Sequence, residues 1–186
     1  MSTVNSETAA GMGEMKRVGQ IMVPLAQYPS VRDNATLRDA IAIIENAQLE
    51  VSLRKSLPRA LLVYDEIDVF VGYVRRRDLM RGLEPKSLVS RPLEYRKKLF
   101  DVQIDPNLSE MSYDHVVKGI REQGNRPVSD VMRPIEATIE ADDHVIKAVY
   151  EMVSSDLNLI PVLDDGQVVG VVRSVDVFHE LALLVR

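Results

Sequence analysis

The 186-residue chain contains no cysteine and no tryptophan, and aromatic residues make up only 5% of it. Without cysteine the protein has neither disulfide bonds nor thiolate chemistry. Scarce aromatic rings and a net charge of −5 argue against a nucleic-acid surface, because such surfaces combine basic stripes with rings on which bases stack. These absences exclude a disulfide-stapled fold and a thiol enzyme, and they disfavour a nucleic-acid partner.

Long hydrophobic runs and a leader pattern are also missing. No apolar stretch approaches the roughly 20 residues that a membrane-spanning helix needs. Residues 1–14 lack a basic segment followed by an apolar one. We therefore expect no membrane association and a cytoplasmic location. With 46% hydrophobic and 27% charged residues, the chain is long enough to bury one sizeable core or two small ones.

The charged residues are unevenly distributed along the chain. Residues 15–83 carry 11 basic and 8 acidic side chains, whereas residues 127–186 carry 4 basic and 11 acidic ones. One interpretation is an ordinary solvated surface. The other is that the two parts form similar sites that differ in their preference for a charged ligand.

Two short motifs occur twice, in the same order. The sequence Val-Gly-Gln-Ile-Met-Val-Pro at 18–24 is echoed by Val-Ser-Asp-Val-Met-Arg-Pro at 128–134. Further along, Gly-x-Val-Arg-x-x-Asp occurs at 72–78 and again at 170–176. Two matched landmarks in one order indicate an internal repeat. The offset between copies falls from 110 to 98 residues, so the first copy holds about a dozen extra residues, which we place near 48–59.

Each copy follows the pattern β-α-β-β-α. Its first helix has apolar residues at the i, i+3, i+4, i+7 spacing, namely Leu37, Ala40, Ile41 and Ile44, and Val145, Ala148, Val149 and Met152. Two apolar strands joined by an acidic turn follow, at 60–64 with 69–74 and at 159–163 with 168–172. A last helix is expected to start at Asp78 in one copy and at Asp176 in the other, with the aspartate as its N-cap.

These patterns predict an α+β fold built from two repeats, residues 16–83 and 127–186. One repeat of about 60 residues buries too little apolar surface to be stable alone, so the two are expected to pack together. Residues 1–15 are expected to be mobile. Residues 84–126 are expected to form a structured tether with a helix near 113–123.

The duplicated landmarks resemble a tandem pair of cystathionine β-synthase-type (CBS) domains, often called a Bateman module. They are the two Met-x-Pro openings, the strand entry Ile160-Pro161-Val162 and the two closing Gly-x-Val-Arg-x-x-Asp motifs. The resemblance implies two repeats around a pseudo-two-fold axis, with an adenosine nucleotide (AMP, ADP, ATP or a relative) bound in clefts between them. It also implies a non-catalytic regulatory module that forms a homodimer through the CBS helices and acts on an effector protein.

In that family the closing aspartate holds the ribose hydroxyls, and a Ser or Thr three residues earlier lies near the phosphates. Asp78 and Asp176 match the aspartate, whereas Arg75 and Arg173 replace the hydroxyl residue. A guanidinium at this position would grip phosphate with two charge-assisted hydrogen bonds, or the phosphate contact would be lost, and both outcomes are open. The alternative for the aspartates is the N-cap role alone, and for the arginines a solvated strand end.

Five further residues are candidates for ligand contacts. Gly72 and Gly170 would let a ligand approach the backbone, or they mark a bulge or tight packing. By the resemblance, Ile160 and Pro161 form an apolar wall against the adenine ring; the alternative is a buried strand with proline at its first residue. Thr138 would contact the base or ribose, or it is simply a β-branched strand residue.

Catalytic and metal-binding patterns are missing. The three histidines fall in different predicted helices with no ligand spacing, so no metal site is expected. There is no Gly-rich phosphate loop and no nucleophile elbow, so an enzyme is the least favoured class, and no cofactor is expected to be required. The leading hypothesis is a nucleotide sensor. The alternative is a ligand-free scaffold that dimerises through the helix at 177–185.

If a nucleotide binds, the charge asymmetry predicts unequal clefts. The cleft lined by the basic first copy would favour a polyphosphate, and the one lined by the acidic second copy would favour a less charged adenosine form.

Overall fold

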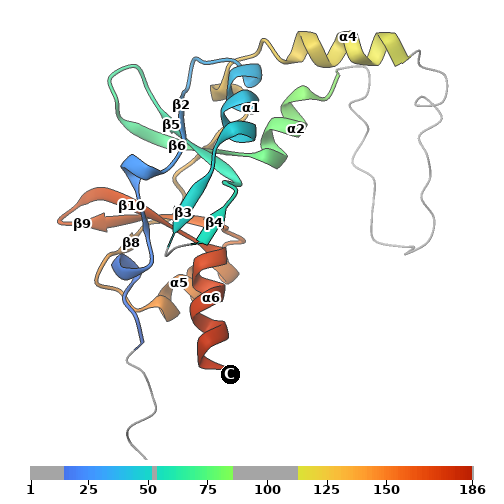
Figure 1. Cartoon of the computed structure of the whole chain (residues 1–186). Coiled ribbons are helices and arrows are strands. Elements are labelled where there is room, and N and C mark those ends of the chain that lie inside the picture. The colour runs from blue at the N-terminus through green and yellow to red at the C-terminus, as the bar shows by residue number, and fades with distance from the viewer. Residues whose placement is uncertain (1–14, 52–53, 86–112, 186) are drawn as a thin grey trace, which may run out of the picture. The chain divides into compact units, whose positions relative to one another are not determined.

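The computed structural model describes residues 15–51, 54–85 and 113–185, and the chain divides into two compact units (Figure 1). Unit 1 combines Met1–Gln27 with Ile135–Arg186, and unit 2 is Tyr28–Pro134. Each unit therefore joins the opening motif of one repeat to the body of the other. The expected mobile N-terminus and most of the expected tether lie outside the described residues.

Unit 2 is built on a four-stranded sheet with the order β2-β5-β6-β7. β2 is parallel to β5, and the other pairs are antiparallel. Its strands are β2 (Ser30–Arg32), β5 (Ala60–Tyr64), β6 (Phe70–Arg75) and β7 (Arg133–Pro134). Its helices are α1 (Leu37–Asn46), α2 (Arg76–Leu83), α4 (Tyr113–Gln123) and the short 3-10 helix η4 (Val128–Asp130). The extra stretch of the first copy contains a separate hairpin, β3 (Leu49–Val51) with β4 (Arg54–Ser56).

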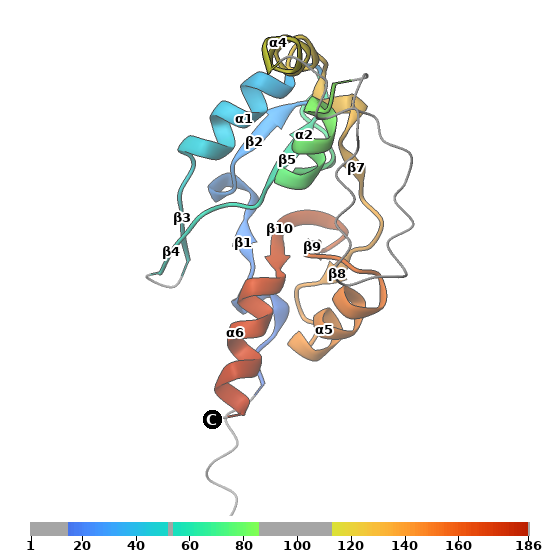
Figure 2. The ribbon, with the colours of Figure 1, turned by 90° about the vertical axis from the view of Figure 1, so that its right-hand side faces the viewer.

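Unit 1 repeats this plan with the order β1-β10-β9-β8 (Figure 2). Its strands are β1 (Val23–Pro24), β8 (Ile139–Glu140), β9 (Leu159–Asp164) and β10 (Gln167–Arg173). Its helices are α5 (Val145–Ser154), α6 (Ser174–Leu184) and the 3-10 helices η1 (Val18–Gln20) and η2 (Leu25–Gln27). Two small mixed sheets and five α-helices in the described part confirm the α+β fold.

The opening motif of each repeat is anchored in its unit by one buried valine and by backbone hydrogen bonds. Val18 is fully buried in the core of unit 1, and its N–H donates to the Asp143 carbonyl at 2.9 Å. Val128 is fully buried in the core of unit 2, and its N–H donates to the Ala35 carbonyl at 2.8 Å. Because a buried valine contributes roughly 1.5–3 kcal/mol, these motifs are part of each core.

Two local features agree with the sequence patterns. Thr36 caps α1, since its hydroxyl accepts from the Asp39 N–H at 3.2 Å while the Asp39 carboxylate accepts from the Thr36 N–H at 3.2 Å. Hydrogen bonds from Thr36 lower the pKa of Asp39 below its usual value. The acidic turn between β9 and β10 has φ angles of 48° at Asp165 and 74° at Gly166, as a two-residue hairpin turn requires.

Candidate functional site

The closing motif of the first repeat places Arg75 and Asp78 where β6 passes into α2. The Asp78 Oδ2 atom accepts from the Arg75 Nε atom at 2.8 Å, and the Oδ1 atom accepts from the Nη2 atom at 3.0 Å. Oδ2 also accepts from the backbone N–H of Arg75 at 3.2 Å. The carboxylate therefore binds a guanidinium with two charge-assisted bonds and ties the first turn of α2 to the end of β6.

The N-cap prediction for both aspartates was wrong. α2 begins at Arg76, with Arg75 as the N-cap, so Asp78 is the third helical residue. α6 likewise begins at Ser174, with Arg173 as the N-cap and Asp176 as the third helical residue. An acidic side chain at this position accepts from the N-cap backbone, as Asp78 does, and also interacts favourably with the helix dipole.

A second cation reaches Asp78 from the opening motif of the second repeat. The Arg133 Nε atom on β7 lies 3.3 Å from the Asp78 Oδ1 atom, and the side chain of Asp78 is only 5% exposed. Our sequence reasoning did not assign a role to Arg133. The sequence does contain a hint of such a role. Arg133 is one of few basic residues in an acidic segment, and it occupies the motif position where the first repeat has Val23.

The two arginines set the charge state of Asp78. Burial raises the pKa of Asp78, but the hydrogen bonds and charge of Arg75, together with the hydrogen bond from Arg133, lower it below its usual value. With four hydrogen bonds from three groups, Asp78 has its four lone-pair sites occupied.

The closing motif of the second repeat makes an equivalent pair in unit 1. The Asp176 Oδ2 atom accepts from the Arg173 Nε atom at 2.6 Å, and Oδ1 accepts from Nη2 at 2.8 Å. The side chain of Arg173 is 7% exposed and that of Asp176 is 15% exposed. Asp176 is thus more open than Asp78 and accepts fewer hydrogen bonds from the described residues.

Gly72 and Gly170 lie where a short strand pairs with the long central strand of each sheet. A Cβ atom on Gly72 would lie 2.2 Å from the Arg133 carbonyl oxygen of β7. A Cβ atom on Gly170 would lie 2.7 Å from the Val23 carbonyl oxygen of β1. Close backbone packing therefore accounts for both glycines, which was one of the two interpretations of the sequence.

The remaining predicted residues are spread over unit 1. Ile160 is fully buried in the core of unit 1, and it pairs with Val172 of β10. Pro161 is buried next to it on β9, opposite Val171. Thr138 is exposed in the segment before β8. The structure thus places Pro161 and Ile160 on the strand beside Arg173 and Gly170, with Thr138 on the approach to the neighbouring strand.

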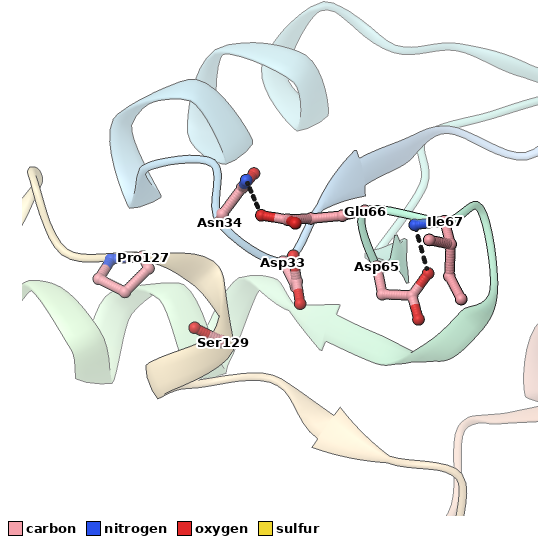
Figure 3. A pocket seen from close by; sticks show the side chains of 7 residues that line it. All are labelled: Asp33, Asn34, Asp65, Glu66, Ile67, Pro127 and Ser129. Atoms are coloured by element: carbon pink, nitrogen blue, oxygen red, sulfur yellow. Dashed lines mark hydrogen bonds between the residues drawn. The ribbon is translucent and has the colours of Figure 1, made fainter.

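A separate open pocket of about 530 Å³ in unit 2 is acidic (Figure 3). It is lined by Asp33, Asn34, Asp65, Glu66, Ile67, Pro127 and Ser129. Two of its polar groups are already paired, since the Asn34 amide donates to Glu66 at 3.3 Å and the Ile67 N–H donates to Asp65 at 3.0 Å. Three carboxylates would repel a phosphate, and none of the predicted ligand residues lines this pocket.

Neither a metal-binding cluster nor a membrane-spanning helix occurs in the part of the chain that the structure describes. No group of three or more His, Cys, Asp or Glu side chains in the described ranges is arranged to hold a metal ion. In the same ranges, every helix is too short or too polar to cross a bilayer.

Comparisons with known proteins agree with the duplicated fold. The CBS domain family model matches residues 18–85 and 128–183. A search of curated proteins found no match. Among solved structures, CBSX2 in complex with AMP is 18% identical, with a TM-score of 0.57, and the alignment covers 91% of this chain and 98% of that one.

Two other solved structures show the same fold. CBSX2 from Arabidopsis thaliana is 19% identical, with a TM-score of 0.58 and coverage of 92% of this chain and 97% of that one. The CBS domain of a bacterial CNNM/CorC family Mg²⁺ transporter in complex with ATP is 18% identical, with a TM-score of 0.56 and coverage of 89% and 87%. Since the family model matches two segments that make up most of its length, the chain belongs to the CBS domain family as a tandem pair.

Proposed function

We propose that this protein is a non-catalytic regulatory module that binds an adenosine nucleotide. The observation that carries the proposal is the Arg-x-x-Asp pair at the start of the last helix of both repeats, at Arg75 with Asp78 and at Arg173 with Asp176. Solved CBS structures similar to this chain hold AMP in one case and ATP in another, which supports the ligand class.

The two aspartates differ in their capacity to bind a ribose. Vicinal hydroxyls donate to a carboxylate, which must have lone pairs to spare. The four lone-pair sites of Asp78 are taken by Arg75 and Arg133. Asp176 accepts two hydrogen bonds from Arg173 and is more exposed, so we assign the ribose contact to Asp176. Arg173 would lie near the phosphates, because its guanidinium is already oriented at the start of α6.

The adenine end of the ligand would use residues of the neighbouring strands. Thr138 offers an exposed hydroxyl before β8, whereas Ile160 and Pro161 are buried on β9 and would back this end of the ligand without direct contact. Gly170 and Gly72 act indirectly, by letting β1 and β7 approach the central strands. The acidic surroundings of unit 1 favour an adenosine ligand with few phosphates, such as AMP, over ATP.

Calorimetry with AMP, ADP and ATP tests the proposal. We expect Asp176→Asn to weaken AMP binding by about 1–3 kcal/mol, the value of a hydrogen bond to a charged group, and Asp78→Asn to have a much smaller effect. Circular dichroism must show that both variants remain folded. Absence of heat and of any thermal shift with all three nucleotides would leave the scaffold function as the better account.

We also infer that the module acts as a homodimer through α5 and α6. Seven large hydrophobic side chains are exposed on these two helices and an eighth follows α6 directly, namely Ile146, Tyr150, Val153, Val175, Phe178, Leu183, Leu184 and Val185. Exposed apolar side chains gathered on two helices of one unit are the kind of surface that a partner covers. This observation also favours the alternative function, a dimerising scaffold without a ligand.

The dimer prediction has a matched pair of variants. Phe178 is 70% exposed on α6, and Met80 is 65% exposed on α2 of unit 2. We expect Phe178→Glu to convert the dimer to a monomer in analytical ultracentrifugation, because it places a charge within the apolar face. The Met80→Glu control is expected to stay dimeric. A wild-type protein that sediments as a monomer at micromolar concentration would contradict the inference.

A further inference from the structure

A groove between three helices of unit 2 is lined by none of the residues proposed to bind the nucleotide. It has a volume of about 410 Å³, within the roughly 300–1,000 Å³ typical of small-molecule sites. Its lining comes from α1, α2 and α4, with Ile41, Leu83 and Ile120 as the apolar part and Arg38, Arg121 and Gly124 completing it. None of these six residues is acidic.

Backbone hydrogen bonds connect two of the three helices that line the groove. The first two N–H groups of α1 donate to the chain just after α4: the Leu37 N–H to the Arg126 carbonyl at 2.9 Å and the Arg38 N–H to the Gly124 carbonyl at 3.0 Å. These bonds satisfy groups that a helix start leaves unpaired. They also join the end of α4 to the start of α1, which lie next to each other in Figure 1. The groove is therefore a preformed feature of unit 2.

Glycines bring α2 close to its two neighbours. A Cβ atom on Gly82 of α2 would lie 2.7 Å from the Leu37 side chain of α1. A Cβ atom on Gly119 of α4 would lie 2.9 Å from the Pro85 side chain, just beyond the end of α2. Because both approaches are too tight for a larger residue, the helices that line the groove are closely packed beside it.

Two arginines are among the residues that line the groove. Arg38 reaches across from α1 and donates to the Arg121 carbonyl of α4 at 3.4 Å, and Arg121 lies on α4 itself. Neither arginine forms an ion pair with a carboxylate of the described residues, whereas Arg32, Arg75, Arg126, Arg133 and Arg173 all do. An apolar floor bordered by two arginines that form no ion pair in the described part of the chain is complementary to an aliphatic chain that ends in a carboxylate.

We propose that this groove binds a medium-chain aliphatic carboxylate. The chain lies on Ile41, Leu83 and Ile120, and the carboxylate binds the guanidiniums of Arg38 and Arg121. The proposal does not depend on nucleotide binding, since no residue of the groove belongs to the Arg-x-x-Asp pairs. A carboxylate with a short chain lacks the apolar contact, and an uncharged or cationic amphiphile lacks the charge contact.

The test titrates the full chain with decanoate below its critical micelle concentration and follows ¹⁵N amide shifts. We expect saturable shifts at Ile120, Arg121 and Gly124, and affinity that rises about two- to fourfold for each methylene from hexanoate to decanoate. The double variant Arg38→Gln/Arg121→Gln is expected to lose about tenfold in affinity. The Arg77→Gln/Arg81→Gln control removes the same two charges from exposed positions on α2 and is expected to bind like the wild type.

A charge reversal completes the test. Decyltrimethylammonium is expected not to shift the groove amides of the wild type, and to shift them in Arg38→Glu/Arg121→Glu. Equal shifts by both amphiphiles in the wild type would indicate unselective adsorption and overturn the proposal. Shifts confined to α5 and α6, or undiminished decanoate binding in the Gln double variant, would also overturn it. Groove shifts that follow protein concentration alone would mean that a second copy covers the groove, and they too would overturn it.

Discussion

Replacing Asp78 with alanine is expected to destabilise the protein by about 2–4 kcal/mol, measured as the change in the free energy of unfolding in urea. Removing one partner of a buried ion pair typically costs about 3–5 kcal/mol, because the other charge is left uncompensated. Arg75 is 19% exposed and Arg133 34% exposed, so water recovers part of that cost. The loss includes the bond from the Arg75 N–H that ties α2 to β6.

The matched control is Asp130→Ala in the same unit. Asp130 accepts from Arg126 at 2.9 Å, but both side chains are about 40% exposed. An exposed pair of this kind contributes under about 1 kcal/mol. If Asp78→Ala cost no more than Asp130→Ala, the buried arginine cluster around Asp78 would not be a significant source of stability.

The contribution of Asp78 also depends on pH in a direction that its environment determines. Because its pKa is lowered in the folded state, ionised Asp78 stabilises the fold above the unfolded-state pKa of about 3.9. That stabilisation is lost as the pH falls through the lowered pKa. The difference between wild type and Asp78→Ala should therefore be constant from about pH 7 to pH 5 and shrink below pH 4. A difference that persists unchanged in acid would contradict this account.

Replacing Gly72 with alanine is expected to cost about 3 kcal/mol or more. The new Cβ atom would lie 2.2 Å from the Arg133 carbonyl oxygen, which is a backbone atom and cannot rotate away. Overpacking costs typically 1–3 kcal/mol, and here relief requires β7 to leave β6. Separation would also carry Arg133 away from Asp78. Urea unfolding measures the loss, and hydrogen exchange at Tyr73 and Arg133 should report the separated strand.

Gly119→Ala is the matched control for this substitution. Its Cβ atom would meet only the side chain of Pro85, at 2.9 Å. Alanine also has a higher helix propensity than glycine, by about 1 kcal/mol in a helix interior. The two effects oppose each other, so we expect a loss clearly smaller than that of Gly72→Ala. A similar loss in both variants would show that the contact with β7 is not what requires glycine at position 72.

Local structure could be predicted well where short-range patterns determine it. Helix α1 begins at Leu37, the first residue of the apolar spacing, and strand β5 covers Ala60–Tyr64, as the sequence pattern indicates. α2 and α6 begin two residues before the predicted aspartates. The shift arises because an aspartate suits both the N-cap and the third helical position, and sequence does not distinguish them.

The candidate site was only partly predictable. Arg75 and Asp78 lie three residues apart, so their pairing follows from the motif once β6 passes directly into α2. Arg133 is 55 residues from Asp78, and its contact depends on the pairing of β7 with β6. No local pattern encodes that pairing, because strand partners are selected by packing over the whole sheet.

By itself the sequence determined the duplicated β-α-β-β-α plan and its family, since periodicity, turns and repeated motifs are properties of neighbouring residues. Only the tertiary structure decided which opening motif joins which body. Val18 is buried with the second repeat, and Val128 is buried with the first. Tertiary structure also decided that Asp78 has its acceptor sites occupied while Asp176 is more open. Both outcomes rest on contacts between distant residues, whose free energy depends on burial and geometry that exist only in the folded chain.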